Sequence, residues 1–440
     1  MRFPFSYLTS RGQADAESLI RSKRWLVLGI GIAAQAAFSA AFQGLPAVGN
    51  QLRTSYSLSL EQLGFALAAI YLGIVVSEVI WGILTDYIGE RVVLVVGLLG
   101  TASVLLILSI FSGRLGTGSS AEILLAVGFL FLGILGGSVN GSSGRAVMAW
   151  FRVGERGLAM SLRQTAVPVG GAIGAAVLPL LAGRGFSIVF GFIAGLCMLT
   201  ALAALLWLTP PPEAEEKASP ALTASKASKQ EVAKKLPDSP LRHWTVWRIA
   251  LASGLLTIPQ FAAITFVPAF LHDDRHLGAV AVSIVLVTIQ LGGASLRVIT
   301  GIWSDRLGQR RPLIRLINWI TVGVLCVAAA FAEGPIGVAI VALILGGIFA
   351  SSWHGITYTE IAEVAGASRS GTALGLENTT VFLGAFITPI AGPAIVHASS
   401  WPILWATVAG ATAISLFLLP KGTRLLKKSI QSKGTSEVRA

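Results

Sequence analysis

The chain has 440 residues, of which 54% are hydrophobic and only 12% are charged, and its mean hydropathy is +0.75. Soluble domains of ordinary composition carry about 25% charged residues, so these values exclude a soluble protein and predict one that lies mostly in a membrane. The formal net charge of +12 does not indicate nucleic-acid binding, because excess Lys and Arg in a membrane protein usually mark cytoplasmic loops.

The first apolar run follows a basic stretch that contains Arg21, Lys23 and Arg24, as a secretory signal would. The run continues from Trp25 to about Val48, however, and so approaches the roughly 20 residues that a spanning helix needs. We therefore expect an uncleaved first helix.

Twelve apolar stretches of near-spanning length predict an all-α membrane protein with two six-helix bundles. The predicted helices cover residues 25–47, 61–84, 91–112, 121–146, 157–181, 186–208, 245–270, 279–302, 312–332, 336–361, 371–397 and 401–419. The stretch between the bundles begins with three prolines and continues with Glu, Ala, Ser and Lys, which is typical of a solvated linker. The predicted divisions are an N-terminal tail (1–24), a first bundle (25–208), a linker (209–243), a second bundle (244–419) and a C-terminal tail (420–440).

The basic residues predict the orientation. Most of the 33 Lys and Arg residues lie in the two tails, the linker and the loops on the same side, whereas the opposite loops hold only Arg53, Arg114, Arg184 and Arg275. The positive-inside rule then places both termini and the linker in the cytoplasm of a multi-pass protein, for which we expect the plasma (inner) membrane.

One sequence pattern occurs twice, at the end of the second and the eighth predicted helix. The two copies are Gly82-Ile-Leu-Thr-Asp86-Tyr-Ile-Gly89-Glu-Arg91 and Gly301-Ile-Trp-Ser-Asp305-Arg-Leu-Gly308-Gln-Arg310. The repeat extends further, since Gly157 and Ala159 align with Gly371 and Ala373. Two halves in the same membrane orientation are therefore expected.

These features resemble those of the major facilitator superfamily, over nearly all of the chain. The first copy matches the family's loop pattern at Gly82, Leu84, Asp86, Gly89 and Arg91, and the second fits it more loosely. The resemblance implies a secondary transporter that alternates access to a central cavity. It also implies a small-molecule substrate, no cofactor and a monomer in the lipid bilayer.

In this family the repeated pattern is implied to act as a conformational latch. An aspartate at a helix end can accept hydrogen bonds from the following arginine and from the N-terminal amides of a facing helix. The alternative is that the aspartates only stabilise turns. The latch candidates are Gly82, Asp86, Gly89, Arg91, Gly301, Asp305, Gly308 and Arg310.

The resemblance also implies that helices 1, 4, 7 and 10 line the cavity, with 2, 5, 8 and 11 beside them. The repeat aligns Asn140 with His354 and Arg163 with Glu377. The substrate-binding candidates are Gln35, Phe38, Phe42, Asn140, Arg145, Arg163, Gln164, Gln260, His354, Tyr358 and Asn378. For each polar residue the alternative is a hydrogen bond between helices.

The two arginines among these candidates, Arg145 and Arg163, favour an anion. A guanidinium in a cavity of low dielectric suits bidentate binding of a carboxylate. The alternative is that the arginines bond helix-end carbonyls or pair with Glu360 or Glu377. The aromatic candidates favour an organic anion over a bare inorganic one.

Proton coupling needs a buried group that can change its protonation state. A histidine titrates near neutrality, and a carboxyl can do so when it loses its hydration. The candidates are Glu78, His354, Glu360 and Glu377. Glu78 and Arg297 occupy equivalent positions before the two patterns, so we also expect them to form an ion pair between the halves.

Other functions lack their signatures. The helix 5 pattern of proton-driven drug antiporters is replaced by Val167-Pro168-Val-Gly170-Gly171. The sequence contains no Walker loop, no Gly-x-Ser-x-Gly elbow and no Cys or His metal cluster, so we expect neither an enzyme nor a metal protein. An exporter of amphipathic compounds and a transporter-like ligand sensor stay open as alternatives.

Overall fold

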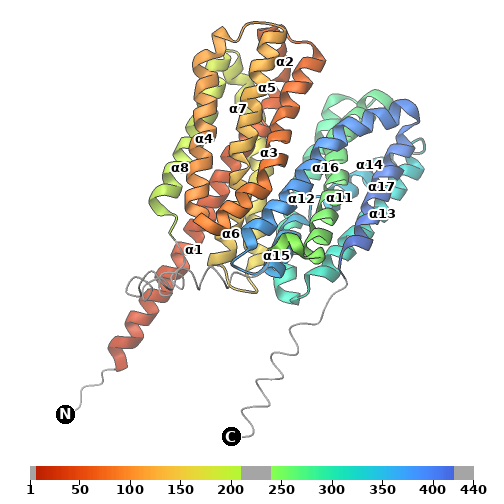
Figure 1. Cartoon of the computed structure of the whole chain (residues 1–440). Helices are drawn as coiled ribbons and strands as arrows, with labels where there is room; N and C mark the ends of the chain where they lie inside the picture. The colour runs from red at the N-terminus through yellow and green to blue at the C-terminus, as the bar shows by residue number, and fades with distance from the viewer. Residues whose placement is uncertain (1–5, 210–238, 421–440) are drawn as a thin grey trace, which may run out of the picture.

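The computed structural model describes residues 6–209 and 239–420, and all of their regular elements are helices (Figure 1). Twelve helical segments of this part are long and apolar enough to cross a membrane, which confirms the predicted twelve. Residues 1–5, 210–238 and 421–440 lie outside the described residues, and with them most of the predicted linker and C-terminal tail.

The helices form two bundles that lie side by side in Figure 1, closest to each other near α6 and α15. The first bundle, here called the N-half, contains α1 (Ser6–Phe42), η1 (Leu45–Val48), α2 (Gly49–Tyr56), α3 (Leu60–Ile88), α4 (Glu90–Phe111), η2 (Ser112–Arg114), α5 (Ser119–Gly136), α6 (Ser138–Trp150), α7 (Arg156–Ala182) and α8 (Phe186–Trp207). The second, the C-half, contains η4 (Pro240–Arg242), α11 (Trp244–Ala269), η5 (Phe270–Asp274), α12 (Ala279–Leu307), α13 (Arg310–Phe331), α14 (Ile336–Ala350), α15 (His354–Ala365), α16 (Ser370–Ala398) and α17 (Trp401–Leu418).

Three predicted spans are interrupted in the structure. The first helix begins earlier than expected, at Ser6, and ends at Phe42, before a Leu45–Val48 turn that contains a proline. The fourth span divides into α5 and α6 at Gly137, and the tenth divides into α14 and α15 at the same place in the repeat. A hydropathy pattern cannot show such breaks, because the residues on both sides of each break are apolar enough to continue a helix.

Local sequence signals explain where the span before the first repeated pattern begins and ends. Ser59 and Gln62 form a reciprocal capping box at the start of α3. The turn after α3 needs Gly89, whose φ of +88° lies in the region that side chains avoid, and Gly308 serves the same turn after α12 with φ +59°. Turn geometry thus explains the second glycine of each repeated pattern.

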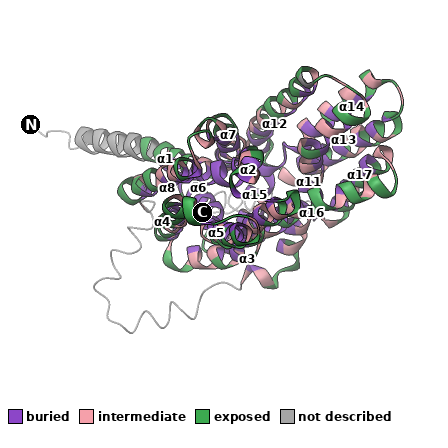
Figure 2. Ribbon diagram, turned by 90° about the horizontal axis from the view of Figure 1, so that it is seen from above, coloured by how far each residue is buried: buried purple, intermediate pink, exposed green. Residues whose placement is uncertain are grey.

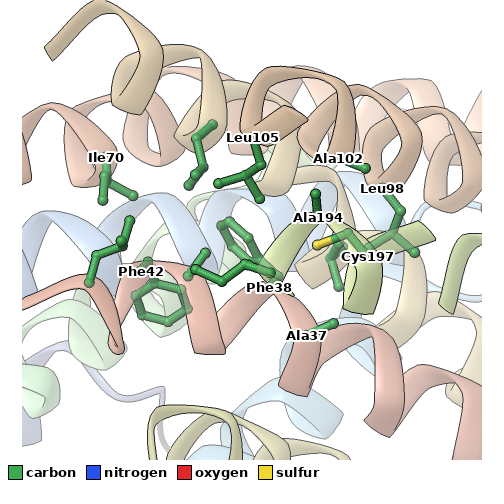
Figure 3. Close-up of a cluster of buried hydrophobic side chains, with 14 of the residues drawn as sticks. Ala37, Phe38, Phe42, Ile70, Leu98, Ala102, Leu105, Ala194 and Cys197 are labelled. Atoms are coloured by element: carbon green, nitrogen blue, oxygen red, sulfur yellow. The ribbon is translucent and has the colours of Figure 1, made fainter. Parts of the chain in front are cut away.

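The core of the N-half is apolar and fully buried. Phe38, Phe42, Leu98, Leu105 and neighbouring side chains interlock in the close-up of Figure 3. Buried residues gather inside both bundles in Figure 2, while exposed large apolar side chains occur along the outer faces, as a surface in contact with lipid requires.

The two cysteines, both within apolar runs of the sequence, differ in burial. Cys197 is buried in the N-half core, but Cys326 is exposed on the apolar outer surface of α13. A cysteine in an apolar run can face either protein or lipid, and hydropathy does not distinguish the two.

Candidate functional site

The aspartate of the first repeated pattern holds the start of a helix in the opposite half. Asp86, near the end of α3, accepts hydrogen bonds from the amides of Gly371 and Thr372, each at 2.8 Å, and from the Thr372 hydroxyl at 2.6 Å. Both donors lie in the first turn of α16, where amides lack partners within the helix and the helix dipole favours an anion. We call these contacts the first latch, and the side of the molecule on which they lie the latch side.

The aspartate of the second pattern makes the equivalent contact, from the C-half to the start of a helix in the N-half. Asp305, near the end of α12, accepts hydrogen bonds from the amides of Gly157 at 2.9 Å and Leu158 at 2.8 Å, at the start of α7. We call these contacts the second latch. Each half therefore holds one helix of the other by a carboxylate at its N-terminus.

The arginine at the end of each pattern makes different contacts in the two latches. Arg310 approaches Asp305 at 3.6 Å, as the sequence predicts. Arg91 instead donates to the backbone carbonyl of Leu205, so the expected contact with its own aspartate is wrong for the first copy.

Arg145 takes the place beside Asp86. Its Nε lies 3.3 Å from the Asp86 carboxylate, and its Nη1 pairs with Glu90. Arg145 was expected in the substrate site, but the structure places it on the latch side, between two carboxylates. The end of helix 4 lies beside the end of helix 2, which the sequence repeat does not reveal, and a substrate role for Arg145 stays a prediction.

Glu363 links the two halves at the second latch. It pairs with Arg310 of its own half and lies 3.6 Å from Arg156 of the N-half. Glu360, a proton-coupling candidate, also lies on this side and forms an ion pair with Arg311 at 2.6 Å. The structure thus places Glu360 among the ion pairs of the latch side rather than in the polar interior between the halves.

Arg163 lies at the centre of the N-half's polar interior and is only 1% exposed. Its Nη2 donates to Gln35 Oε1 at 2.7 Å and to the Asn140 carbonyl at 2.6 Å, and its Nε donates to Ser143 Oγ at 3.0 Å. Residues from α1, α6 and α7 therefore fix the guanidinium. All of these partners are uncharged.

Glu78 lies next to this group, on α3, and is completely buried. Its Oε1 accepts a hydrogen bond from Asn140 Nδ2, while its Oε2 has no hydrogen-bond partner within residues 6–209 and 239–420. Asn378 of the C-half faces this carboxyl, and its own Nδ2 also lacks a partner among the described residues. One buried carboxylate oxygen and one buried amide donor thus face each other across the boundary between the halves.

The C-half contributes a second polar group. The Tyr358 hydroxyl lies 2.5 Å from Asn378 Oδ1, and Glu377, completely buried, accepts a hydrogen bond from Ser253 at 2.7 Å. His354 stacks on the ring of Trp353 with a centroid distance of 3.8 Å. The sequence candidates on helices 10 and 11 therefore do lie together.

Arg297 crosses to the N-half without meeting Glu78. Its Nε donates to the carbonyl of Ser351 at 2.9 Å and its Nη1 to the carbonyl of Gln164 at 2.8 Å. Among the ion pairs of the described residues, none joins Glu78 to Arg297, so the expected ion pair is wrong for this conformation. Helix–helix packing offers carbonyl partners that sequence positions alone do not predict.

Tyr358 connects the two polar groups. It lies within electrostatic reach of Arg163, Glu78, Glu377 and Arg297, and its hydroxyl faces the side chain of Gln164. We refer to the whole set as the central polar cluster, whose members are Gln35, Glu78, Asn140, Ser143, Arg163, Gln164, Arg297, His354, Tyr358, Glu377 and Asn378.

The remaining substrate candidates lie at the edges of this cluster or outside it. Phe38 is buried within the N-half, against Gly136. Phe42 packs its ring against Phe382 of the C-half, with 5.6 Å between centroids. Gln260 of α11 is partly buried, and none of its described contacts reaches the cluster.

Several functional neighbours were not predicted from the sequence. Ser143 and Ser253 are small polar residues in apolar helices, and only their partners distinguish them from helix-bonded serines. Thr372 follows Gly371 at the start of the eleventh helix, and the equivalent residue in the fifth helix is Leu158. The hydroxyl group present in only one of the two copies could have indicated the contact with Asp86.

The described polar and aromatic contacts between the halves extend from the latch side, past the central polar cluster, to one group of aromatic rings. They involve Phe42 of α1 and residues 71–87 of α3, 156–164 of α7, 297–305 of α12, 359–363 of α15 and 369–382 at the start of α16. Within the described residues, the opposite parts of these helices make no such contact with the other half. The latch side is therefore closed, and the two bundles diverge toward the other side (Figure 1).

Comparisons with known proteins agree with this architecture. An uncharacterized MFS-type transporter of Mycobacterium tuberculosis is 34% identical over 419 residues, which cover 93% of this chain and 89% of the relative. A probable sulfoacetate transporter of Cupriavidus necator is 24% identical over 359 residues, or 77% of this chain and 79% of the relative. The structure of the proton:xylose symporter XylE bound to 6-bromo-6-deoxy-D-glucose superposes with a TM-score of 0.70 at 15% identity, covering 91% of this chain and 96% of that one, and shows the same fold.

The sequence profile of the Major Facilitator Superfamily matches residues 27–317 and 249–438. Together the two matches span both halves and both latches. The chain is thus a multi-pass secondary transporter rather than an enzyme, and it belongs to the Major Facilitator Superfamily.

Proposed function

We propose that this transporter carries a small organic anion, together with protons, across the plasma membrane. The observation that carries the proposal is the buried pair of guanidiniums, Arg163 and Arg297. Within the described residues neither makes an ion pair, and their described hydrogen-bond partners are all neutral. A buried charge without a directly bonded counter-charge is costly, and an anionic substrate would supply such a partner when the nearby carboxyls are protonated.

The two buried carboxyls of the cluster fit proton coupling. Glu78 and Glu377 are each completely buried, and each receives a hydrogen bond from a neutral side chain and leaves one oxygen without a partner. A protonated carboxyl could donate a hydrogen bond from that oxygen. Protonation would also remove negative charge from the cluster, so that the positive charge of the two guanidiniums is no longer balanced. Binding of protons and of an anion would then favour each other.

The polar side chains near the two arginines favour a particular substrate chemistry. Tyr358, Gln35 and Asn378 add hydrogen-bonding groups to the two guanidiniums, which suits a carboxylate or sulfonate that carries further polar groups. The name of the Cupriavidus relative, a probable sulfoacetate transporter, supports a small organic acid.

The movement that we propose follows from the latches. The two halves, residues 25–208 and 244–419, rock about the central polar cluster, and the Asp86 and Asp305 contacts release when the latch side opens. The basic loops and the described chain ends, Ser6 and Pro420, lie on this side, which we assign to the cytoplasm by the positive-inside rule. In that assignment the described conformation is closed to the cytoplasm.

Purified protein offers a direct test of the substrate class. Organic acids that bind should raise the unfolding temperature of the parent and of an Arg114→Gln control, whose arginine is exposed on η2. Arg163→Lys should lose most of that ligand-induced rise, because lysine keeps the charge but not the planar fork. The variants are compared by their ligand-induced rise and not by their absolute unfolding temperatures. The reason is that the substitution also leaves Gln35 without its partner and lowers the unfolding temperature of the ligand-free protein.

Uptake into proteoliposomes then tests the coupling. An inward proton gradient should drive accumulation of the labelled acid that gave the largest thermal rise. The proposal fails if no organic acid is bound or accumulated, or if Arg163→Lys responds as the control does. Binding of amphipathic cations instead would favour the export of such compounds.

A further inference from the structure

Three aromatic rings meet across the boundary between the halves. Phe42 is the last residue of α1, Tyr71 lies in α3, and Phe382 lies in α16. The centroid distances are 5.6 Å for Phe42 and Phe382, 6.1 Å for Phe42 and Tyr71, and 6.5 Å for Tyr71 and Phe382. Each ring therefore touches the other two.

The rings lie on the far side of the central polar cluster from the latches. Along α3 the order from the latch side is Asp86, Glu78 and Tyr71, and the rise of about 1.5 Å per residue puts Tyr71 roughly 10 Å beyond Glu78. Along α16 the order is Thr372, Asn378 and Phe382, with Phe382 roughly 6 Å beyond Asn378. The cluster is thus bounded by the latches on one side and by the rings on the other.

Among the polar and aromatic contacts that the described residues of α3 and α16 make with the other half, these rings lie farthest from the latch side. A weaker contact, between the Thr379 hydroxyl and the Val75 carbonyl at 3.5 Å, lies between them and the cluster. Beyond the rings, the described parts of α3 and α16 make no polar or aromatic contact with the other half. The rings therefore lie between the cluster and that side along α3 and α16.

The contacts among the three rings differ in chemistry from those of the latches. Phe42 and Phe382 are buried, with 1% and 7% of their surface exposed. Edge-to-face ring contacts are weaker than charged hydrogen bonds at a helix start, so they can separate while the latches hold. Phe42 also lies where α1 ends and the chain turns into η1, a place at which a small backbone change would move the ring.

We propose that Phe42, Tyr71 and Phe382 form an aromatic lid over the central polar cluster, which opens to admit the substrate and packs against its carbon skeleton once the substrate is bound. The lid does not depend on the substrate being an anion. Tyr71 and Phe382 are the residues that it adds to the transport pathway.

Cysteine labelling in proteoliposomes tests the lid without a known substrate. Asn378→Cys on a Cys326→Ser background places one thiol in the cluster beneath the rings, while Cys197 stays buried. A small, water-soluble methanethiosulfonate reagent is added on the side opposite the latches. Labelling should be slow in this parent and at least tenfold faster with Phe382→Ala or Phe42→Ala.

The matched control is Phe131→Ala, which removes an exposed ring on α5. Phe382→Tyr, which keeps the ring, should restore slow labelling and so separates lid opening from misfolding. The lid is refuted if labelling is unchanged by Phe382→Ala, if Phe131→Ala accelerates it equally, or if Phe382→Tyr labels as fast as Phe382→Ala.

Discussion

Asp86 and Thr372 are joined across the two halves by two hydrogen bonds, one from the Thr372 amide at 2.8 Å and one from its hydroxyl at 2.6 Å. The carboxylate also accepts the amide of Gly371 at 2.8 Å. Asp305 receives amides only, because Leu158 stands at the position equivalent to Thr372. The first latch therefore has one more hydrogen bond, whereas at the second latch an ion pair of Glu363 with Arg156 joins the two halves.

Asp86→Asn should open the latch side. The substitution removes the charge that three donors share, and hydrogen bonds to charged groups contribute about 1.5–3 kcal/mol each. A loss of about 2 kcal/mol would lower the ratio of closed to open molecules roughly 30-fold. A Ser161→Cys reporter on α7, which is buried against Gly301, should label faster from the latch side.

Glu61→Gln is the control for this experiment, since Glu61 is exposed at the other end of α3. It should leave the labelling rate unchanged. Equal rates for Asp86→Asn and Glu61→Gln would show that the Asp86 contacts do not hold the latch side closed.

Glu363→Gln should weaken the second latch in a salt-dependent way. Glu363, Arg310 and Arg156 are partly exposed, so the loss should be near 1 kcal/mol and should shrink as ionic strength rises. Because Arg310 also approaches Asp305, a double-mutant cycle of Glu363→Gln with Asp305→Asn should show coupling. The Ser161→Cys labelling rate at low and high salt measures both effects.

Glu333→Gln, at an exposed site beyond α13, controls for the change of net charge. Additive effects of the two latch substitutions would contradict the chain of ion pairs. An effect of Glu363→Gln that does not depend on salt would contradict its electrostatic origin.

The fold was predictable from sequence to a large extent, and the latch contacts less so. Hydropathy located all twelve spans, because a spanning helix must be apolar over most of its length. The repeat located Asp86 and Asp305. It could not show that Arg145 rather than Arg91 would reach Asp86, since that depends on how two helix ends pack.

For the central polar cluster, too, the sequence located the residues better than it predicted their contacts. Alignment of the two halves brought attention to Asn140, His354, Arg163 and Glu377, and all four lie in or beside the cluster. The alignment also suggested an ion pair of Glu78 with Arg297 that the structure does not contain. Symmetry predicts which positions are equivalent, whereas the partners depend on the rotation and break of each helix.

Glu78→Gln should separate substrate movement from proton movement. Glutamine keeps the acceptor for Asn140 but can neither gain nor lose a proton. Exchange of labelled for unlabelled substrate across the membrane should persist, whereas accumulation driven by a proton gradient should be lost. The matched variant Glu377→Gln tests whether the second buried carboxyl has the same role.

Transport assays of these two variants have a clear interpretation. Gradient-driven accumulation by Glu78→Gln at the parental level would remove Glu78 from the coupling mechanism. Loss of accumulation only in Glu377→Gln would assign the proton to the C-half instead.

Gly82→Ala should prevent the latch side from closing, even though alanine favours helix formation by up to 1 kcal/mol over glycine. A methyl group at Gly82 would lie about 3.0 Å from the backbone carbonyl carbon of Gly371 and 3.1 Å from the Cα of Thr372. Backbone atoms cannot move aside as a flexible side chain can, so α3 and α16 would have to separate and the Asp86 contacts would lengthen. Gly64→Ala is the matched control on the same helix, because a methyl group there meets nothing within 4 Å. The Ser161→Cys thiol should label faster in Gly82→Ala and at the parental rate in Gly64→Ala; equal rates in both would mean that close packing at Gly82 is not needed for closure.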